Sequence, residues 1–358
     1  MKGNWFKIVL ALIVLLVRLC PDAWTQEKKN DILSITPAIT FSWYPYADFY
    51  KESSTETKLD LNNFGMSITM NLKFFDKVGV HLNLTIDDPT FKKTVGFAGY
   101  LTASYFLLKF DYHAFGGTVT WTGNTPNPIP DGVYNFRNQW NNISLFLRVD
   151  QLPIEQWIAS APNLLWFLYM PLDFLYSFGL IGGRNLGAIG IGYANFDMPL
   201  KYMGKSDSEL SNPGFGLITG NVWGFTMLWD TLTRHMELPV YQGSDLSVKF
   251  LNAIWLYVDC FFGFPTGKGK TDEQAIAWMS NANNGVSVNG NINGSVEYSI
   301  FKIILGLQHV WDVGKKGRIG LAAGVEILEE TISATNNDIN VYFRSRHIGP
   351  AVRLSVRW

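Results

Sequence analysis

Charged residues and cysteines are scarce in this chain. Asp, Glu, Lys and Arg make up 16% of the 358 residues, and the formal net charge is −1. This balance gives no indication of nucleic-acid binding, which depends on an excess of basic side chains. The only cysteines are Cys20 and Cys260. If an N-terminal segment carrying Cys20 is removed, no internal disulfide can form.

The chain also lacks the hydrophobicity of a helical membrane protein. Its mean hydropathy is only +0.06, although 47% of the residues are hydrophobic and 15% are aromatic. A protein with several transmembrane helices would be markedly more hydrophobic. Low charge, many aromatics and average hydropathy together fit alternating strands, in which a polar face dilutes an apolar one.

The N-terminus reads as a secretory signal peptide over residues 1–25. Lys2 and Lys7 precede the apolar run Ile8–Val17, and a polar stretch follows it. The apolar run is too short to span a membrane comfortably. We therefore expect an exported protein in which residues 26–358 form one domain.

Alternation of apolar and polar residues marks the strands that follow. It is clearest in Leu33–Trp43, Phe64–Phe74 and Val78–Ile86, and the connections between these strands are first long and then short. Long loops on one side and short turns on the other are typical of outer-membrane barrels. The sequence predicts an all-β fold, a transmembrane antiparallel up-and-down β-barrel of about twelve strands, with ten or fourteen as alternatives.

Several segments do not follow the alternation. We read Lys109–Asp111 and Thr231–Glu237 as polar turns. Residues 152–178 suggest a helical insertion in the lumen or at the membrane interface. For the apolar part, Leu164–Tyr176, a transmembrane helix and lipid-facing strand ends with a wide aromatic girdle stay open as alternatives. Near Gly349-Pro350 we expect a bulge or kink that switches which residues face the lumen.

The charged residues of the later strands are predicted to line the lumen. A charge on the lipid face is expensive, so the apolar side of each strand is assigned to lipid and the other side to the interior. In the strand around Val296 and Tyr298, this assignment places Glu297 inside. The candidate lumen-lining residues are Lys249, Asp259, Glu297, Arg318, Glu326, Arg344, Arg346, Arg353 and Arg357.

The last nine residues, Pro350–Trp358, alternate regularly and end on an aromatic side chain. They resemble the C-terminal strand of bacterial outer-membrane β-barrel proteins, where such a strand serves as the assembly signal. The resemblance implies localisation in the bacterial outer membrane. It also implies two partners, the lipid bilayer and the barrel-assembly machinery, which would recognise the final strand.

Motifs for catalysis are weak. The five histidines are scattered without zinc-ligand spacing, so we expect no metal, no cofactor and no enzymatic activity. The leading functional prediction is a porin-like channel that passes small solutes or hydrophobic substrates. The alternative is a surface-exposed adhesin or structural barrel that binds partners through its long loops. An open lumen would favour the channel, and a packed lumen would favour the adhesin.

Overall fold

The computed structural model describes most of the chain between residues 33 and 357. The described residues are 33–44, 46–51, 57–61, 64–74, 78–86, 96–103, 105–121, 132–148, 186–202, 214–237, 253–270, 291–314, 317–336 and 339–357. The expected signal peptide, the insertion at 152–178, Lys249 and Trp358 lie outside these residues.

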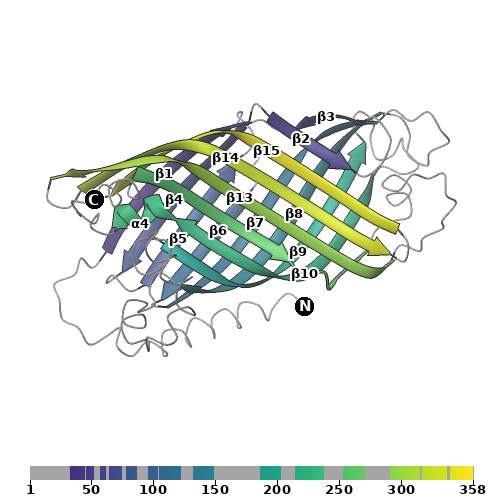
Figure 1. Ribbon diagram of the computed structural model, residues 1–358, viewed down its shortest axis with the longest axis horizontal. Coiled ribbons are helices and arrows are strands. Elements are labelled where there is room, and N and C mark those ends of the chain that lie inside the picture. The colour runs from purple at the N-terminus through teal and green to yellow at the C-terminus, as the bar shows by residue number, and fades with distance from the viewer. Residues whose placement is uncertain are drawn as a thin grey trace, which may run out of the picture.

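Twelve strands form a closed antiparallel β-barrel, as the sequence predicted (Figure 1). Each strand pairs with the next along the ring, and the first and last strands, β1 and β15, pair with each other to close it. The strands are β1 (Leu33–Trp43), β4 (Phe64–Phe74), β5 (Val78–Ile86), β6 (Gly96–Ala103), β7 (Phe106–Trp121), β8 (Gly132–Arg148), β9 (Leu186–Tyr202), β10 (Gly214–Asp230), β11 (Ile254–Gly263), β13 (Asn291–Val313), β14 (Gly317–Asn336) and β15 (Ile339–Arg357).

Three short strands extend the wall at one end. β2 (Tyr46–Lys51) pairs with β15 beyond β1, β3 (Thr57–Leu61) pairs with β7 beyond β6, and β12 (Gly267–Lys270) pairs with β10 and β13 beyond β11. We call this end of the barrel the loop end. The opposite end, where β1 begins and β15 finishes, is called the terminal end.

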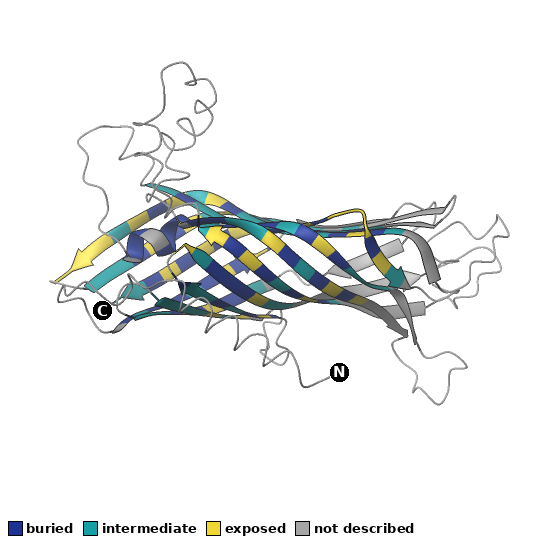
Figure 2. Cartoon of the chain, turned by 90° about the horizontal axis from the view of Figure 1, so that it is seen from below, coloured by how far each residue is buried: buried dark blue, intermediate teal, exposed yellow. Residues whose placement is uncertain are grey.

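Residues alternate between the two faces of the wall, and Figure 2 shows this as alternating buried and exposed bands along the strands. In β1, Thr36 and Thr40 are buried inside the barrel, whereas Phe41 and Trp43 are exposed on the outside. Cross-strand partners share a face, so the register carries this assignment around the ring. A polar inner face and an apolar outer face are the arrangement that a lipid environment requires.

The outward apolar residues form a continuous belt around the terminal part of the barrel. Toward the loop end the belt stops, and Asn141, Asn195 and Glu297 are the outward residues instead. Tyr193 and Trp223 lie at the border, with ring centroids 5.1 Å apart, as expected of an interfacial aromatic girdle. The belt includes Phe41, Ile68, Met70, Leu82, Leu84, Phe97, Phe110, Leu145, Leu147, Ile191, Phe262, Leu305, Leu307, Leu321, Val325, Val352 and Leu354.

Beyond the belt, apolar residues lie on the inner face of the wall and polar residues lie on the outer face. Val296 and Tyr298 are fully buried inside the barrel, and Glu297 between them is exposed outside. The prediction that Glu297 faces the lumen is therefore wrong. Its premise was that the apolar face meets lipid, but this part of β13 lies past the apolar belt, where water replaces hydrocarbon and the apolar face turns inward.

The expected bulge near Gly349-Pro350 is also absent. β15 pairs with β14 from Ile339 to Arg357 without a shift in register. Arg344 and Arg346 consequently share the outward face, opposite to Arg353 and Arg357, and their assignment to the lumen is wrong.

Two predicted turns are regular structure. Lys109–Asp111 lies inside β7, with both charged side chains on the inner face. Thr231–Glu237 is a helix, α4. No helix within the described residues is long and apolar enough to cross a membrane.

Candidate lumen site

Helix α4 lies inside the barrel at the terminal end (Figure 1). It packs against Gly320 on the inner face of β14, where an added Cβ would lie 2.7 Å from the Met236 sulfur and 3.1 Å from Leu232 Cδ1. Leu232 and Met236 are fully buried together with Trp255 and Ala322. Small wall residues thus leave room for the helix, which occupies this part of the lumen.

The start of α4 is fixed by the last residue of β10. Asp230 Oδ1 accepts a hydrogen bond of 3.1 Å from the Thr233 amide, and Asp230 Oδ2 accepts one of 2.6 Å from the Thr233 hydroxyl. An N-cap aspartate of this kind satisfies an amide that the helix leaves without a partner. Leu232 and Met236, one helical turn apart, then face the wall together.

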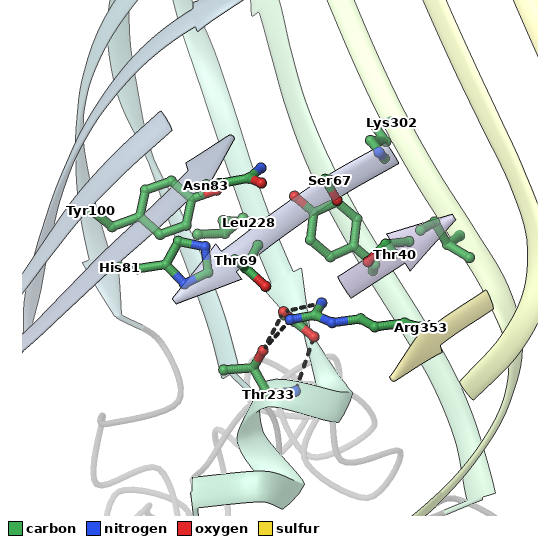
Figure 3. A pocket seen from close by; sticks show the side chains of 13 residues that line it. Thr40, Ser67, Thr69, His81, Asn83, Tyr100, Leu228, Thr233, Lys302 and Arg353 are labelled. Atoms are coloured by element: carbon green, nitrogen blue, oxygen red, sulfur yellow. Dashed lines mark hydrogen bonds and ion pairs between the residues drawn. The ribbon is translucent and has the colours of Figure 1, made fainter. Parts of the chain in front are cut away.

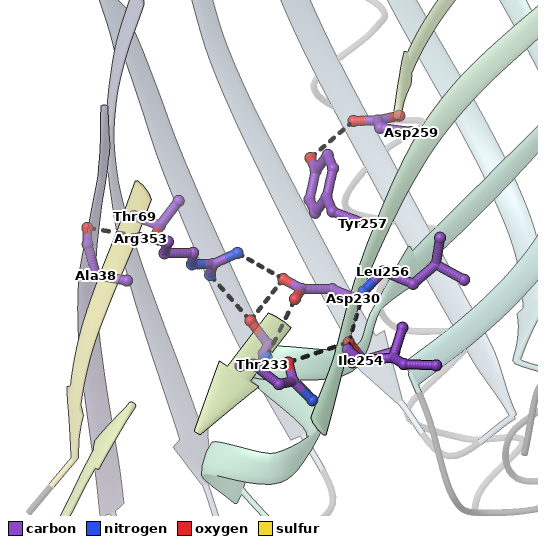
Figure 4. A network of polar contacts seen from close by, with 11 residues as sticks. Ala38, Thr69, Asp230, Thr233, Ile254, Leu256, Tyr257, Asp259 and Arg353 are labelled. Atoms are coloured by element: carbon purple, nitrogen blue, oxygen red, sulfur yellow. Dashed lines mark hydrogen bonds and ion pairs between the residues drawn. The ribbon is translucent and has the colours of Figure 1, made fainter. Parts of the chain in front are cut away.

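Arg353 on β15 binds this helix start from the opposite side of the lumen (Figure 4). Its Nη1 lies 3.0 Å from Asp230 Oδ2, and its Nη2 donates a 3.0 Å hydrogen bond to the Thr233 hydroxyl. Arg353 is only 3% exposed, so both contacts lie away from bulk solvent and are stronger than surface contacts. We call this group, Arg353 with Asp230 and Thr233, the latch.

Two further arginines bind the other end of α4. Arg318 donates to the His235 carbonyl at 3.1 Å, and Arg357 donates to the Met236 carbonyl at 3.0 Å. These carbonyls belong to the last turn, where helix carbonyls lack intrahelical partners. Arg318, Arg353 and Arg357, all predicted to face the lumen, therefore face it and hold a helix there.

A polar chamber lies next to α4 in the middle of the lumen (Figure 3). Its volume is about 30 Å³, which is enough for about two ordered water molecules. Hydroxyl and amide side chains from β1, β4 and β5 form one side: Thr40, Ser67, Thr69 and Asn83. Lys302 and the latch lie around the rest of the wall.

An ion-pair cluster borders the chamber on the side away from α4. Lys109 Nζ lies 2.6 Å from Asp259 and 2.9 Å from Asp111, and the lysine is 1% exposed. Tyr257 donates a further hydrogen bond to Asp259 (Figure 4). Asp259 was predicted to face the lumen; its partners Lys109 and Asp111 were missed. Leu108, Phe110 and Tyr112 alternate with these two charged residues, and this alternation could have identified the segment as a strand with Lys109 and Asp111 on its inner face.

Glu326 connects three strands across the inner wall. It is fully buried, accepts hydrogen bonds from Ser42 at 2.5 Å and Tyr44 at 2.7 Å, and lies 3.0 Å from Lys302 Nζ. Its neighbour on β15 is Gly349, whose lack of a side chain leaves space for the β1 residues to reach across. Glu326 thus faces the interior as predicted and has a partner for its charge.

An aromatic seal packs inside the barrel against β8, β9, β11 and β13, on the loop side of these ion pairs. We give this name to Trp140, Phe196, Phe261 and Tyr298, each at most 3% exposed. Their ring centroids are 4.9–5.7 Å apart in the contacting pairs, and the Tyr298 hydroxyl donates to Glu330. The chamber therefore lies between α4 at the terminal end and the aromatic seal toward the loop end.

Comparison with known proteins adds no assignment of function. No family model and no curated protein matches the chain. Among solved structures, it resembles CdiB from Acinetobacter baumannii (8% identity, 92% of this chain and 60% of that chain, TM-score 0.25). It thus spans 60% of the length of CdiB.

Two other solved structures cover nearly the whole chain. One is the transport unit of the autotransporter AIDA-I from Escherichia coli (7% identity, 96% and 95% coverage of this and that chain, TM-score 0.29). The other is the P. putida toluene transporter TodX (9% identity, 92% and 90% coverage, TM-score 0.25). At these identities and scores, function has to be inferred from the geometry of this chain.

Proposed function

We propose that this protein is a gated passage for small polar solutes through the bacterial outer membrane. The observation that carries the proposal is the small polar chamber in the middle of a barrel whose outer wall is apolar. A barrel that served only as a rigid support could fill its lumen with apolar side chains. Here buried charges and hydroxyls surround a space instead, and polar groups favour a polar occupant over a hydrophobic one.

Helix α4 is the proposed gate. It is held by side-chain hydrogen bonds at both ends and by the packing of Leu232 and Met236. Buried hydrogen bonds that involve charged groups contribute about 1.5–3 kcal/mol each. Loss of the latch is therefore expected to raise the population of the open state by about tenfold or more.

Localisation in the outer membrane is part of the proposal. The apolar belt supports it, because exposed side chains such as Leu307 and Leu305 would be unfavourable in water. We further propose that β15 is the strand that the barrel-assembly machinery recognises, on the basis of its alternating residues next to β1.

The aromatic seal favours a second candidate function, a structural barrel or adhesin that binds partners at its loop end. Trp140 and Tyr298 pack with full burial where a constitutively open channel would need a path. Under this alternative, the latch and the seal are permanent, and no change to α4 produces conduction.

Planar-bilayer recordings of the refolded protein distinguish these candidates. The unlatched variant combines Arg353→Met with Asp230→Asn, which removes the ion pair while asparagine still caps the helix. We expect its open probability to exceed that of the wild type by about tenfold or more.

A locked variant provides the matched control. Met236→Cys with Gly320→Cys, in a Cys260→Ala background, places two thiols where Met236 Cγ lies 3.5 Å from the position of a Cβ at residue 320. A cysteine sulfur in the place of Met236 Cγ would then lie within reach of the second cysteine. We expect the oxidised variant to stay closed and a reductant to restore opening. If the unlatched variant remains silent even with Trp140→Ala and Tyr298→Ala added, the passage proposal is wrong and the adhesin alternative is favoured.

A further inference from the structure

We infer that the terminal end of the lumen attracts small anions and admits them in preference to cations, so that the solutes of the proposed passage carry carboxylate or phosphate groups. The inference rests on the proposed function for the passage itself. Its own basis is the sign of the charges on the inner wall at this end, together with the groups that two of the arginines bind. We call this part of the inner wall the vestibule.

Cationic side chains are concentrated in the vestibule. Near the end of β4, Lys73 is the cross-strand partner of the buried Ser34, and at the end of β8, Arg148 is the partner of the fully buried Ala188. Cross-strand partners share a face, so Lys73 and Arg148 belong to the inner face. With the three arginines that hold α4, they make five cations on the wall around this end of the lumen.

Carboxylates of the wall do not balance these cations. Among the wall residues that the structure describes, the vestibule has two aspartates, namely Asp230 in the latch and Asp312, which lies 3.1 Å from Arg318. Five cations and two carboxylates leave an excess of three positive charges, although the whole chain has a formal net charge of −1. In the middle of the lumen, by contrast, Lys109 and Lys302 lie among three carboxylates. The positive excess therefore belongs to the terminal end.

Two of the vestibule arginines bind oxygen atoms that a solute could replace. Arg318 and Arg357 are cross-strand partners, and they donate to the carbonyl oxygens of His235 and Met236 in the last turn of α4. When α4 moves as proposed, these carbonyl oxygens leave with it. Guanidinium groups are well suited to carboxylate and phosphate oxygens. The solute oxygens would then take the place that the helix carbonyls occupy in the closed state.

A positive vestibule favours anions through its potential and needs no tight binding site. Rings of Arg and Lys side chains provide anion selectivity in pores. A cleft lined by charges of one sign raises the local concentration of counter-ions by about tenfold or more. The same potential repels cations. The inference therefore concerns the sign of the solute's charge, and it requires no cavity that would hold the solute while α4 is in place.

Reversal potentials of the unlatched variant in a potassium chloride gradient test the inference. This variant removes one cation and one carboxylate, so the excess of three positive charges is kept. We expect chloride to permeate about tenfold more readily than potassium. The preference should weaken as the salt concentration rises, because screening shortens the range of the vestibule charges. A preference for potassium would overturn the inference.

Neutral substitutions assign the selectivity to the vestibule. In the unlatched background, Lys73→Gln with Arg148→Gln removes two charges from strands other than those of the arginines that hold α4. The chloride preference should fall to about threefold or less. The matched control, Lys268→Gln with Arg346→Gln, removes one lysine and one arginine from the outer wall and should leave the preference unchanged. An equal preference in the two double variants would contradict the assignment.

A thiol probe measures the vestibule potential whether or not the barrel conducts. The Asp312 side chain is 69% exposed, so Asp312→Cys in a Cys260→Ala background provides an accessible thiol. The rates of modification by an anionic sulfonate and a cationic trimethylammonium methanethiosulfonate are compared, each relative to its rate with free cysteine. The sulfonate should be favoured by about tenfold, and adding Lys73→Gln with Arg148→Gln should reduce this ratio.

The two measurements separate the inference from the proposed function. A silent bilayer with the sulfonate favoured at residue 312 would reject the passage and support the anion-attracting vestibule. Conduction with a preference for potassium would reject the inference alone. A thiol at residue 312 that favours the trimethylammonium reagent, or shows the same ratio as free cysteine, would overturn the inference whatever the bilayer recordings show.

Discussion

The guanidinium of Arg353 lies 3.0 Å from the carboxylate of Asp230, although the two residues are 123 positions apart in the sequence. Arg353 belongs to β15, the last strand of the barrel, and Asp230 is the residue that caps α4. The pair therefore couples the strand that closes the ring to the helix that occupies the lumen. A barrel in which β15 has not yet joined β1 also lacks the partner that keeps α4 in place.

Gly320 is predicted to be the wall position at which an added side chain disturbs α4 most. In Gly320→Val, the new Cβ would meet the Met236 sulfur at 2.7 Å, and overpacking of this kind costs about 1–3 kcal/mol. We expect the helix to leave its place while the strand pairing survives. Limited proteolysis at α4 measures this directly, and faster cleavage with unchanged circular dichroism is the expected result.

The control for this variant is a glycine on the outer wall. Gly99→Ala places a Cβ no closer than 3.8 Å to any neighbour, which is an ordinary contact. Its cleavage rate at α4 should equal that of the wild type. Equal rates for Gly320→Val and Gly99→Ala would show that α4 does not pack where we place it.

Lys109 is predicted to be essential for stability because two carboxylates depend on it. Lys109→Met leaves Asp111 and Asp259 near each other without a cation, and breaking a buried pair in this way costs about 3–5 kcal/mol. Urea unfolding in lipid vesicles measures the loss. Adding Asp111→Asn and Asp259→Asn should recover most of it, whereas the exposed Lys268→Met should change stability by less than about 0.5 kcal/mol.

The barrel itself could be predicted from the sequence because its physical cause repeats along the chain. Each strand such as Leu33–Trp43 or Val78–Ile86 carries its own two-faced pattern, and lipid outside the wall enforces the same rule on every strand. The charges at Arg318, Glu326 and Arg353 followed from that rule as well.

The rest could not be predicted because it depends on contacts far apart in the sequence or on where the membrane ends. The rule that apolar residues face lipid reverses at the border of the belt, and the sequence of β13 does not mark that border before Glu297. In the sequence alone, Lys109 resembles a residue of a polar turn. Its partner Asp259 is distant in the sequence and lies 2.6 Å from it only in the fold. In α4, seven residues are too short for helical periodicity to be visible, and their partners are wall residues such as Gly320.

The apolar belt predicts opposite tolerances for charge at two outward positions of β13. Leu307 is 65% exposed within the belt, so Leu307→Arg should cost about 2–4 kcal/mol in a bilayer. Glu297 lies outside the belt, and Glu297→Arg should cost less than about 0.5 kcal/mol. Unfolding measured in vesicles provides both values; similar costs at the two positions would mean that the membrane border is elsewhere.

Tyr44 is predicted to stabilise the closed ring through its hydroxyl. It donates a 2.7 Å hydrogen bond to Glu326, and this bond joins the end of β1 to β14 across β15. Tyr44→Phe keeps the ring but leaves one carboxylate oxygen of a fully buried glutamate with fewer donors, so we expect a loss of about 1.5–3 kcal/mol. Tyr105→Phe is the matched control, because Tyr105 is exposed in the turn between β6 and β7 and should lose at most about 0.5 kcal/mol. The urea midpoint of each variant in vesicles makes the comparison. Since the Tyr44 hydroxyl acts through Glu326, Tyr44→Phe should cost less in a Glu326→Gln background than in the wild type, and an equal cost in both backgrounds would contradict this assignment.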